Sequence, residues 1–304
     1  MQKVEELANT SADRAGVKLP LSVIVAAKNE EKNLRRCLES LRNVGEVYVI
    51  DSGSTDATPE IARSYGAKVV QFRYQGGWPK KRQWAMENLP LAFDWIFLVD
   101  ADEALPAKLA DEIQVAIQNS DVNGYYIFLK MYFLGRLLRY GGAGFWKLAL
   151  FRRGKGVYEC RLKDQDPTMA DMEIHEHVVV EGTTARLRNS LQHHNVESLS
   201  RYIRKHDEYS NWEARVWIEG GTAELVPNLF GTQAQRRRWL KAKFLRLPGA
   251  PLWFFLFKYI LCLGILDGIP GLIYCGFQAV QVFHIKAKIF ELERAETRGG
   301  PNLG

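Results

Sequence analysis

The chain has few cysteines, and no two of them are spaced as in a known motif. Cys37, Cys160, Cys262 and Cys275 are far apart in the 304 residues, and no C-x-x-C occurs. This argues against a disulfide framework and against a cysteine-based zinc site. We therefore expect four small buried thiols in a protein of a reducing compartment.

Other signatures are missing as well. The N-terminal residues are polar and contain no apolar segment of the signal-peptide kind, so we expect residues 1–19 to form a flexible tail. The first apolar run, residues 21–27, continues into Lys-Asn-Glu and not into G-x-G-x-x-G, which argues against a dinucleotide-binding oxidoreductase. No internal repeat or low-complexity tract is evident in the sequence.

The composition is that of a folded protein with a modest excess of base. Hydrophobic residues make up 47% and charged residues 25%, and the net charge is +6. This charge suits anionic ligands such as nucleotides, lipid headgroups or nucleic acid. The basic cluster adjoins apolar sequence and not an aromatic-lined sheet, so we expect no nucleic-acid partner.

Apolar runs alternate with amphipathic stretches along residues 20–130. We expect strands at 21–27, 47–50, 68–72, 95–99 and 125–129, and helices at 31–42, from about 56, at 79–89 and at 106–118. This alternation predicts an α/β fold, Rossmann-like, with a mostly parallel sheet and helices on both faces. Beyond residue 131 the pattern loosens, with short strands expected at 146–151 and 174–180 and a helix at 198–219.

Carboxylates follow several of the predicted strands. Asp100-Ala101-Asp102-Glu103 comes directly after one strand, and Lys28-Asn29-Glu30 and Asp51 come after two others. Open α/β sheets bind ligands at this edge. Three carboxylates in four residues repel each other unless a cation lies among them, and Mg²⁺ or Mn²⁺ carrying a diphosphate fits this requirement.

Each of these residues also has a plainer interpretation. Asp51 could close a turn and cap the next helix, and Asp102 and Glu103 could be solvated residues before the helix at Pro106. We expect Glu103 in particular to begin that helix. Only the convergence of several strand ends on one crevice favours a nucleotide site.

Three segments in this half resemble a family 2 glycosyltransferase with a GT-A fold. They are LSVIVAAKNEEKNLRRCLESL, VYVIDSGSTDAT and DWIFLVDADE, and the resemblance covers about residues 20–130. It implies that Asp51 contacts the base of a nucleotide-sugar, that Asp100 lies near the ribose and metal, and that Asp102 ligates the metal at the diphosphate. It also implies that the first loop, with Ala27, Asn29 and Glu30, lines the nucleotide pocket. Many members have proline where this chain has Ala26 or Ala27.

The second half resembles a narrower bacterial subgroup, which includes lipopolysaccharide-core glucosyltransferase-like proteins. The segments are IHEHVVVEG (174–182), HHNVESLSRYIRKHDEYSNWEA (193–214) and FKYILCLGILDGIPGLIYCGFQAV (257–280). The resemblance implies hexose transfer from a nucleotide-sugar, expected to be a UDP-sugar, to a membrane-associated saccharide or lipid, as in lipopolysaccharide or cell-surface polysaccharide synthesis. A polyprenyl-phosphate glycosyltransferase and a non-catalytic nucleotide-binding membrane scaffold are the alternatives.

Family 2 enzymes invert the anomeric centre, so a carboxylate must deprotonate the acceptor hydroxyl. We choose Glu176, which strand alternation places on the apolar side with Ile174 and Val178, where an unused carboxylate is costly. Asp171 and Glu173 are the runners-up. His194 is a candidate third metal ligand after Asp100 and Asp102, with a surface histidine as the alternative.

Cations outside the strand ends also attract interest. One of Lys80, Lys81 and Arg82 is expected to reach a phosphate, unless they form a solvated helix start. Gln235-Arg236-Arg237-Arg238-Trp239 fits the Q-x-x-R-W pattern of processive family 2 synthases, in which Trp contacts the acceptor sugar and Arg the diphosphate. A basic helix at a membrane surface explains these arginines equally well.

The C-terminal part changes character. Residues 236–246 carry six cations and no acid, and residues 251–283 are mostly apolar but broken at 267–271. Two pieces that are each shorter than the ~20 residues of a spanning helix predict an interfacial or re-entrant membrane element. A buried helical hairpin is the alternative. We therefore divide the chain into 1–19, a GT-A domain over 20–225 (nucleotide half 20–130, acceptor half 131–225) and a membrane-associating region over 226–304, at the cytoplasmic face of the inner membrane.

Overall fold

The computed structural model describes residues 18–162, 173, 176–194, 198–219, 228–230 and 233–297. The strands among them are β1 (Leu19–Ala27), β2 (Val44–Asp51), β3 (Lys68–Gln71), β4 (Trp95–Asp100), β5 (Glu103–Ala104), β6 (Gly124–Phe133), β7 (Arg136–Leu137), β8 (Phe145–Arg152), β9 (Gly156–Tyr158), β10 (Val178–Val180) and β11 (Thr184–His194). The helices are α2 (Glu31–Ser40), α3 (Thr58–Ser64), α4 (Lys81–Asn88), α5 (Ala107–Ala116), α6 (Leu199–Ile218), α7 (Gln233–Leu245), α8 (Ala250–Leu256) and α9 (Gly268–Thr297). Between α8 and α9 lie a π-helical turn η1 (Phe257–Leu261) and a 3-10 turn η2 (Gly264–Asp267).

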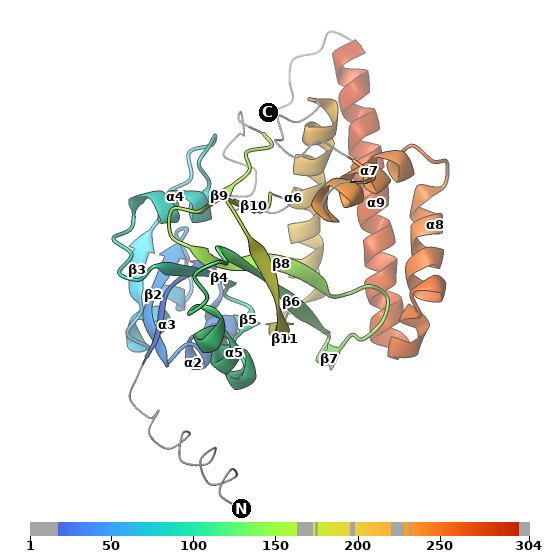
Figure 1. Ribbon diagram of the computed structural model, residues 1–304. Coiled ribbons are helices and arrows are strands. Elements are labelled where there is room, and N and C mark those ends of the chain that lie inside the picture. Colours follow the sequence, from blue (N-terminus) through green and yellow to red (C-terminus); the bar gives the residue numbers. More distant parts are fainter. Residues whose placement is uncertain are drawn as a thin grey trace, which may run out of the picture.

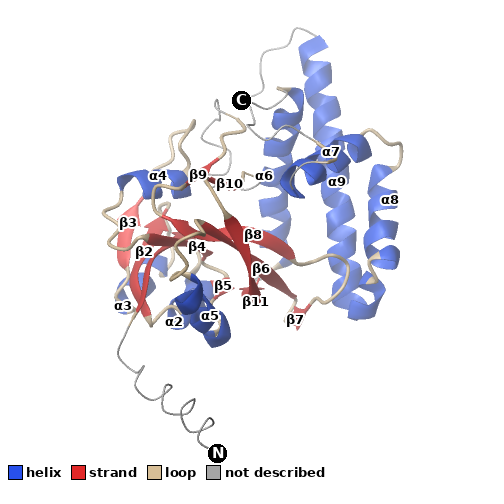
Figure 2. Ribbon diagram, in the orientation of Figure 1, coloured by secondary structure: helices blue, strands red, loops and turns tan. Residues whose placement is uncertain are grey.

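The described strands form one large mixed sheet and a small two-stranded sheet of β9 and β10 (Figures 1 and 2). The order in the large sheet is β3-β2-β1-β4-β8-β6-β11-β5, with β7 paired to β6. The β1–β2, β2–β3, β1–β4 and β6–β11 pairs are parallel, whereas β8 runs antiparallel to both β4 and β6. The α/β prediction is confirmed, but the sheet is less parallel than expected, because β8 inserts between β4 and β6.

Helices cover both faces of the sheet, as expected. Apolar residues of α2, α3 and α5, such as Leu34, Ile61 and Leu109, pack on one face in the largest core cluster. Residues of α4 and of the small β9–β10 sheet, such as Ala85 and Val178, pack on the other face. The layers therefore leave the carboxyl ends of β1, β2 and β4 at one common edge.

Two short elements differ from the sequence expectation. Glu103 does not begin a helix but lies in β5, opposite His193 of β11, and α5 begins only at Ala107. The strand expected at 174–180 covers only Val178–Val180, and residues 174 and 175 lie outside the described part of the chain. In both places the chain follows a long-range pairing partner and not its local pattern.

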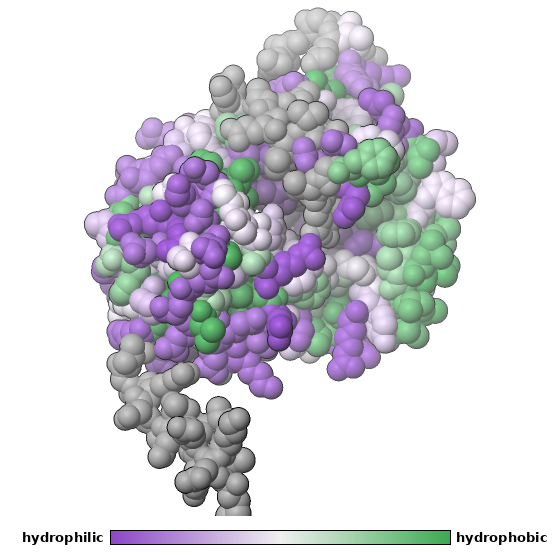
Figure 3. Space-filling view, in the orientation of Figure 1, coloured by the Kyte–Doolittle hydropathy of each residue, from purple (hydrophilic) through white to green (hydrophobic). Residues whose placement is uncertain are grey.

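The C-terminal helices lie beside the sheet domain. Helices α6 and α9 pack side by side, and α8 packs on α9 (Figure 1). The second apolar piece is not a short helix, because α9 continues past Phe283 through polar residues to Thr297. The segment Gly264–Ala295 is long and apolar enough to cross a membrane, with a mean hydropathy of 1.2 in its most apolar window. Figure 3 shows apolar residues gathered over the outer side of α8 and α9.

The turn between α8 and α9 is fastened to the loop between β7 and β8. The buried carboxylate of Asp267 accepts hydrogen bonds from the backbone N–H groups of Arg139 (3.1 Å) and Tyr140 (2.9 Å). The N–H of Gly141 donates to the carbonyl of Cys262 at 2.8 Å, and Lys258 Nζ donates to the carbonyl of Gly142 at 3.2 Å. The hairpin formed by α8 and α9 is thus held to the sheet domain by hydrogen bonds as well as by apolar packing.

We expect Asp267→Ala to lower the free energy of unfolding by about 1–3 kcal/mol, because two backbone N–H groups lose the buried carboxylate that accepts from them. Chemical denaturation of the full chain measures this change. Asp94→Ala removes an exposed carboxylate, 82% accessible and paired only at the surface with Arg153, and should change stability by less than about 0.5 kcal/mol. Equal stability of the Asp267→Ala variant and the parent would contradict the fastening role.

Candidate active site

The loop after β1 and the turn after β2 are joined by hydrogen bonds. Asn29 has a left-handed backbone (φ 54°), which asparagine tolerates better than most residues. Its N–H donates to Ser54 Oγ and its Oδ1 accepts from the N–H of Thr55, both at 2.8 Å. The N–H of Glu30 donates to Thr58 Oγ1 at 2.8 Å. The two loops therefore form one rim at the carboxyl edge of the sheet.

Ala27 and Asp51 end the two central strands of this rim. The carbonyl of buried Ala27 accepts from Lys81 Nζ at 3.2 Å. The Asp51 carboxylate is also buried and accepts from the N–H of Ser54 (3.1 Å) and from Gln71 Nε2 (2.9 Å). Asp51 thus closes its turn, as the plainer interpretation expects, and its contact with a nucleotide base stays a prediction.

A pocket adjoins Asp51 on the side of Gln71. Its lining is rich in aromatic rings: Gln71, Phe72, Arg73, Tyr74, Gln75, Gly76, Trp78, Pro79 and Trp84. Phe72 contacts the indole of Trp84 at a ring distance of 5.3 Å. Flat apolar walls next to a hydrogen-bonded carboxylate suit a heteroaromatic ring. The sequence reasoning missed this pocket, although four aromatics within thirteen residues signalled it.

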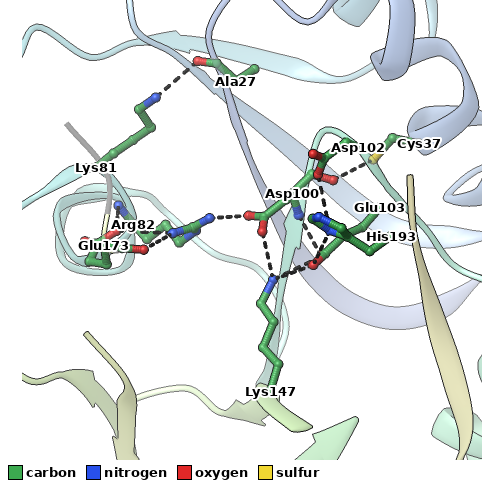
Figure 4. Close-up of polar contacts among 10 residues, drawn as sticks. All are labelled: Ala27, Cys37, Lys81, Arg82, Asp100, Asp102, Glu103, Lys147, Glu173 and His193. Carbon is green, nitrogen blue, oxygen red and sulfur yellow. Dashed lines mark hydrogen bonds and ion pairs between the residues drawn. The ribbon is translucent and has the colours of Figure 1, made fainter. Parts of the chain in front are cut away.

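The carboxylates at and after the end of β4 face cations from two other elements, α4 and β8 (Figure 4). The guanidinium of Arg82 pairs with Asp100 Oδ1, and Lys147 Nζ lies 3.3 Å from Asp100 Oδ2 and 3.0 Å from the Glu103 carboxylate. Although burial opposes the charged form, Arg82 and Lys147 hold the pKa of Asp100 well below its usual range. The repulsion noted in the sequence is thus largely offset by the protein's own cations.

The imidazole that approaches this cluster is His193 and not His194. Nδ1 of His193 lies 3.6 Å from Asp102 Oδ1 and 3.7 Å from Glu103 Oε1. Against the effect of burial, Asp102 and Glu103 raise the pKa of His193 above its usual value. His194 stacks on Tyr132 at a ring distance of 4.4 Å, and burial with nearby Arg36 lowers the pKa of His194 to about 4. Consecutive strand residues point to opposite sides, so only one of the pair can contact the carboxylates.

The first turn of α4 carries three consecutive cations, and none of them is solvated. Lys80, Lys81 and Arg82 are at most 4% exposed, so the alternative of a solvated helix start is excluded, and contact of one of them with a phosphate stays a prediction. Cations at a helix N-terminus are unfavourable, and carboxylates offset them here. Glu173 accepts from the N–H of Arg82 (3.2 Å) and the N–H of Gln83 (2.9 Å), which caps the helix from 90 residues away. This capping engages both oxygens of one runner-up for the base.

Glu176 lies beside the same helix start. Its Oε2 is 3.0 Å from Lys80 Nζ, and both side chains are fully buried. Burial raises the pKa of Glu176 to about 7, although Lys80 acts in the opposite direction. Lys80 Nζ also lies 5.3 Å from the ring centre of Trp212 in α6. A buried carboxylate that titrates near neutral pH is suited to accept a proton.

One face of α6 runs along the whole site, which the sequence reasoning did not foresee. Arg201 donates to the carbonyl of Asn29 (2.8 Å) and pairs with Glu30 Oε1 (2.6 Å). One turn later, the charges of Asp102 and Glu30 help to raise the pKa of Lys205, against burial. Burial and Asp102 raise the pKa of Glu30 itself to about 7. The spacing Arg201, Lys205, Trp212 is that of one helix face and could have been recognised as such.

Some predicted residues lie outside what the structure describes. These are Asp171 and the side chains of Arg237 and Arg238 in the Q-x-x-R-W segment. Trp239 of that segment lies in α7, with Lys243 Nζ 5.8 Å from its ring centre. The acceptor role of this segment therefore stays a prediction.

The predicted metal ligands do not form a cluster of their own. Within the described residues no group of three His, Cys, Asp or Glu side chains is arranged to hold a metal ion. Both oxygens of Asp100 face cations, and His194 is turned toward Tyr132. Asp102 is left as the carboxylate that fits a metal, and this is sufficient for Mg²⁺ or Mn²⁺ when substrate phosphates and water complete the shell. Of the three predicted ligands, Asp102 fits a metal best, and metal binding by Asp100, Asp102 and His194 stays a prediction.

Comparisons with known proteins agree with this geometry. The model of the family "Glycosyl transferase family 2" matches residues 22–170. The lipopolysaccharide core biosynthesis glycosyltransferase LpsC of Rhizobium meliloti is 29% identical over 94% of this chain and 97% of its own. An uncharacterized glycosyltransferase of Rickettsia bellii is 41% identical over about a third of each chain.

Among solved structures, glucosyl-3-phosphoglycerate synthase from Mycobacterium tuberculosis matches 69% of this chain and 82% of its own. The identity is 15% and the TM-score is 0.38, too low to support conclusions about the site. The family model and the near full-length relative show that residues 22–170 form a glycosyl transferase family 2 domain and that the chain is a glycosyltransferase with an α/β fold.

Proposed function

We propose that the enzyme moves a hexose from a nucleotide-sugar, a UDP-sugar, to a hydroxyl of a membrane-associated saccharide or lipid, with inversion. The observation that carries this proposal is Glu176, a buried carboxylate that titrates at about 7 beside the nucleotide edge. Through Lys80 and Arg82, the first turn of α4 connects Glu176 to Asp100. A candidate base and the donor-binding carboxylate therefore have a fixed relative position.

The reaction is a single displacement. The acceptor oxygen forms a bond to the anomeric carbon while the bond from that carbon to the donor's phosphate oxygen breaks. The electron pair of the breaking bond stays on the nucleoside diphosphate, and Glu176 takes the proton of the acceptor hydroxyl. Attack from the side opposite the leaving group inverts the anomeric centre.

Binding of the donor is assigned to the carboxyl edge of the sheet. Ala27, Asn29, Glu30 and Asp51 form its rim, and Asp100 is assigned to the ribose. Asp102 would hold Mg²⁺ or Mn²⁺, whose charge would offset that of the departing diphosphate. Lys205 of α6 supplies a further positive charge near Asp102, whose negative charge helps to raise the pKa of Lys205.

The acceptor class rests on the relative and on the C-terminal helices. The similarity to LpsC extends over nearly the whole chain, which supports an acceptor of the lipopolysaccharide or cell-surface polysaccharide type. The apolar outer side of α8 and α9 supports a position at a membrane, which we assign to the cytoplasmic face. A polyprenyl phosphate acceptor has little need of a base, so the burial of Glu176 and its raised pKa favour a hydroxyl acceptor.

We expect Glu176→Gln to reduce kcat about 10²- to 10⁴-fold, because the proton acceptor is lost, while donor affinity is unchanged. Transfer is measured with a panel of UDP-hexoses, Mn²⁺ and membrane extract as the acceptor source, and UDP affinity by calorimetry. Glu181→Gln is the matched control, since the Glu181 side chain is 77% exposed and pairs with Lys155 at the surface. Full transfer by Glu176→Gln would place the base elsewhere or favour the phosphate acceptor.

The pH profile of transfer should report the same carboxylate. Only ionised Glu176 accepts a proton, so the rate should fall about tenfold per pH unit below its pKa of about 7 and level off above it. Lys80 stabilises the ionised form, so Lys80→Met should raise this pKa and move the falling limb to higher pH; Glu173, the other charged neighbour, is unchanged. Lys155→Met, at an exposed lysine, should leave the profile in place, and an unmoved limb in Lys80→Met would exclude Glu176 as the titrating group.

Asp102→Asn should remove the effect of Mn²⁺ on UDP binding, because the amide is a weaker metal ligand than the carboxylate. Calorimetric titration of UDP with and without Mn²⁺ measures this effect. Asp94→Asn, at an exposed carboxylate, serves as the control. The metal role of Asp102 fails if Mn²⁺ strengthens UDP binding equally in the Asp102→Asn variant and in the parent.

A further inference from the structure

An apolar stripe runs along the outer side of α9. Ile269, Leu272, Val280, Phe283 and Phe290 are 43–74% exposed, and Gly276 and Ala287 fill the gaps in their three- and four-residue spacing. This spacing places all seven positions on one helix face. A soluble monomer seldom leaves a continuous stripe of this length in water. The stripe therefore requires something to cover it.

The turn and α8 add further exposed apolar residues, and Figure 3 shows apolar residues gathered over α8 and the turn. Trp253 and Phe257 are about half exposed, and Leu261 and Ile265 at the turn are 74% and 52% exposed. Tryptophan with aliphatic neighbours is typical of a protein surface at the lipid headgroup boundary. We call this surface, from Trp253 to Phe290, the outer face.

The charge around the outer face selects its partner. Residues 233–290 contain nine lysines and arginines and one acid, Asp267, whose carboxylate is buried. Lys241 and Lys288 pair with Glu213 and Asp207 of α6, and Lys258 is buried, so the excess of positive charge comes from the other six. A second copy of the chain would bring two positive regions together, which is unfavourable. Anionic lipid headgroups are attracted to the same region, at about 1 kcal/mol for each nearby cation.

The opposite side of α9 shows how deep this contact can go. Gln278 Nε2 donates to Tyr202 Oη of α6 at 3.3 Å, and Lys288 Nζ pairs with Asp207 of α6 at 2.6 Å. If α9 crossed a bilayer at this level, it would take α6 and this ion pair into hydrocarbon, which is costly. A helix with one apolar face and one polar, protein-covered face lies in the plane of the interface.

We propose that the outer face binds an anionic bilayer and enters one leaflet without crossing it. The proposal specifies the partner in the proposed function and rests on that function only for the statement that the acceptor is membrane-associated. Helix α6 contacts α9 through Tyr202 and the site through Arg201. Two helices, α9 and α6, each about 10 Å across, therefore separate the lipid on the outer face from the donor loop, so the acceptor sugar must stand about 20 Å from that lipid.

Sedimentation with vesicles tests the proposal on the full chain. The parent should bind phosphatidylcholine vesicles that contain phosphatidylglycerol, and bind pure phosphatidylcholine more weakly. The double variant Ile269→Glu/Phe283→Glu should lose binding by about tenfold or more, because two apolar side chains that would enter the bilayer are replaced by carboxylates. Both positions are exposed, so its thermal unfolding should match that of the parent. The control is Val115→Glu, at a 70% exposed valine of α5, which should bind like the parent.

A second measurement separates insertion from surface attraction. Brominated lipids should quench the fluorescence of Trp253, and Trp253→Phe should remove the quenched component. Equal vesicle binding by the double variant, or binding without quenching, would overturn insertion. A dimer that forms without lipid and is lost in the double variant would assign the face to a second copy.

Crossing and the proposed activity are checked separately. A C-terminal epitope that becomes protected from protease after the protein is added to the outside of vesicles would show that α9 crosses, against the proposal. Mn²⁺-dependent hydrolysis of the UDP-sugar in the absence of lipid should be the same in the double variant and the parent. Loss of vesicle binding with retained hydrolysis supports the bilayer contact, whereas absent hydrolysis in the parent concerns the proposed function alone.

Discussion

The pairing of buried charges around Asp100 and the start of α4 is the constraint on which the rest of the site depends. Carboxylates from β4, β5 and the segment before β10 meet cations from α4 and β8, and nearly all are shielded from water. Removing one partner from such a set leaves an uncompensated buried charge, at a cost of about 3–5 kcal/mol. The pairs therefore hold their elements at fixed positions, whether or not they add net stability.

This constraint explains how a base and a donor site can be built from distant parts of the chain. Glu173 caps α4, and Glu176, three residues later, pairs with Lys80 of the same helix start. The cations of α4 would be misplaced in isolation, because they lie at the positive end of the helix dipole. The local sequence is thus unfavourable, and one of the two carboxylates that offset it, Glu176, is the proposed base.

Features set by local pattern could be predicted, and features set by distant pairing could not. The apolar runs before Asp51 and Asp100 predicted strands, and the position of both residues at the carboxyl edge followed from the parallel arrangement. The position of β8 between β4 and β6 could not be predicted, because the apolar sequence of a strand does not specify its neighbours in a sheet. Which of His193 and His194 approaches the carboxylates depends on which side of β11 faces β5, and the local sequence pattern does not reveal this. Arg201 and Lys205 were overlooked because their partners lie more than 100 residues away.

Helix α6 has two different neighbours on its two sides. Arg201 and Trp212 face the site, whereas Tyr202 and Asp207 face α9. The polar residues of α6 are explained by these contacts, because each side of the helix pairs with a different part of the molecule. It links the nucleotide loop to the C-terminal hairpin through a single rigid element.

The packing between the hairpin and the end of β6 bears on how the enzyme can be shortened. Met131, Phe133, Leu138 and Tyr202 share one buried cluster with Tyr274 and Cys275 of α9. A protein truncated after residue 225 would expose the first four of these side chains to water and leave the 138–143 loop without the hydrogen bonds of the hairpin. Truncation intended to yield a soluble catalytic fragment would instead expose a new apolar surface that favours aggregation. Purification of the intact chain in a mild detergent is therefore the better route to an active preparation.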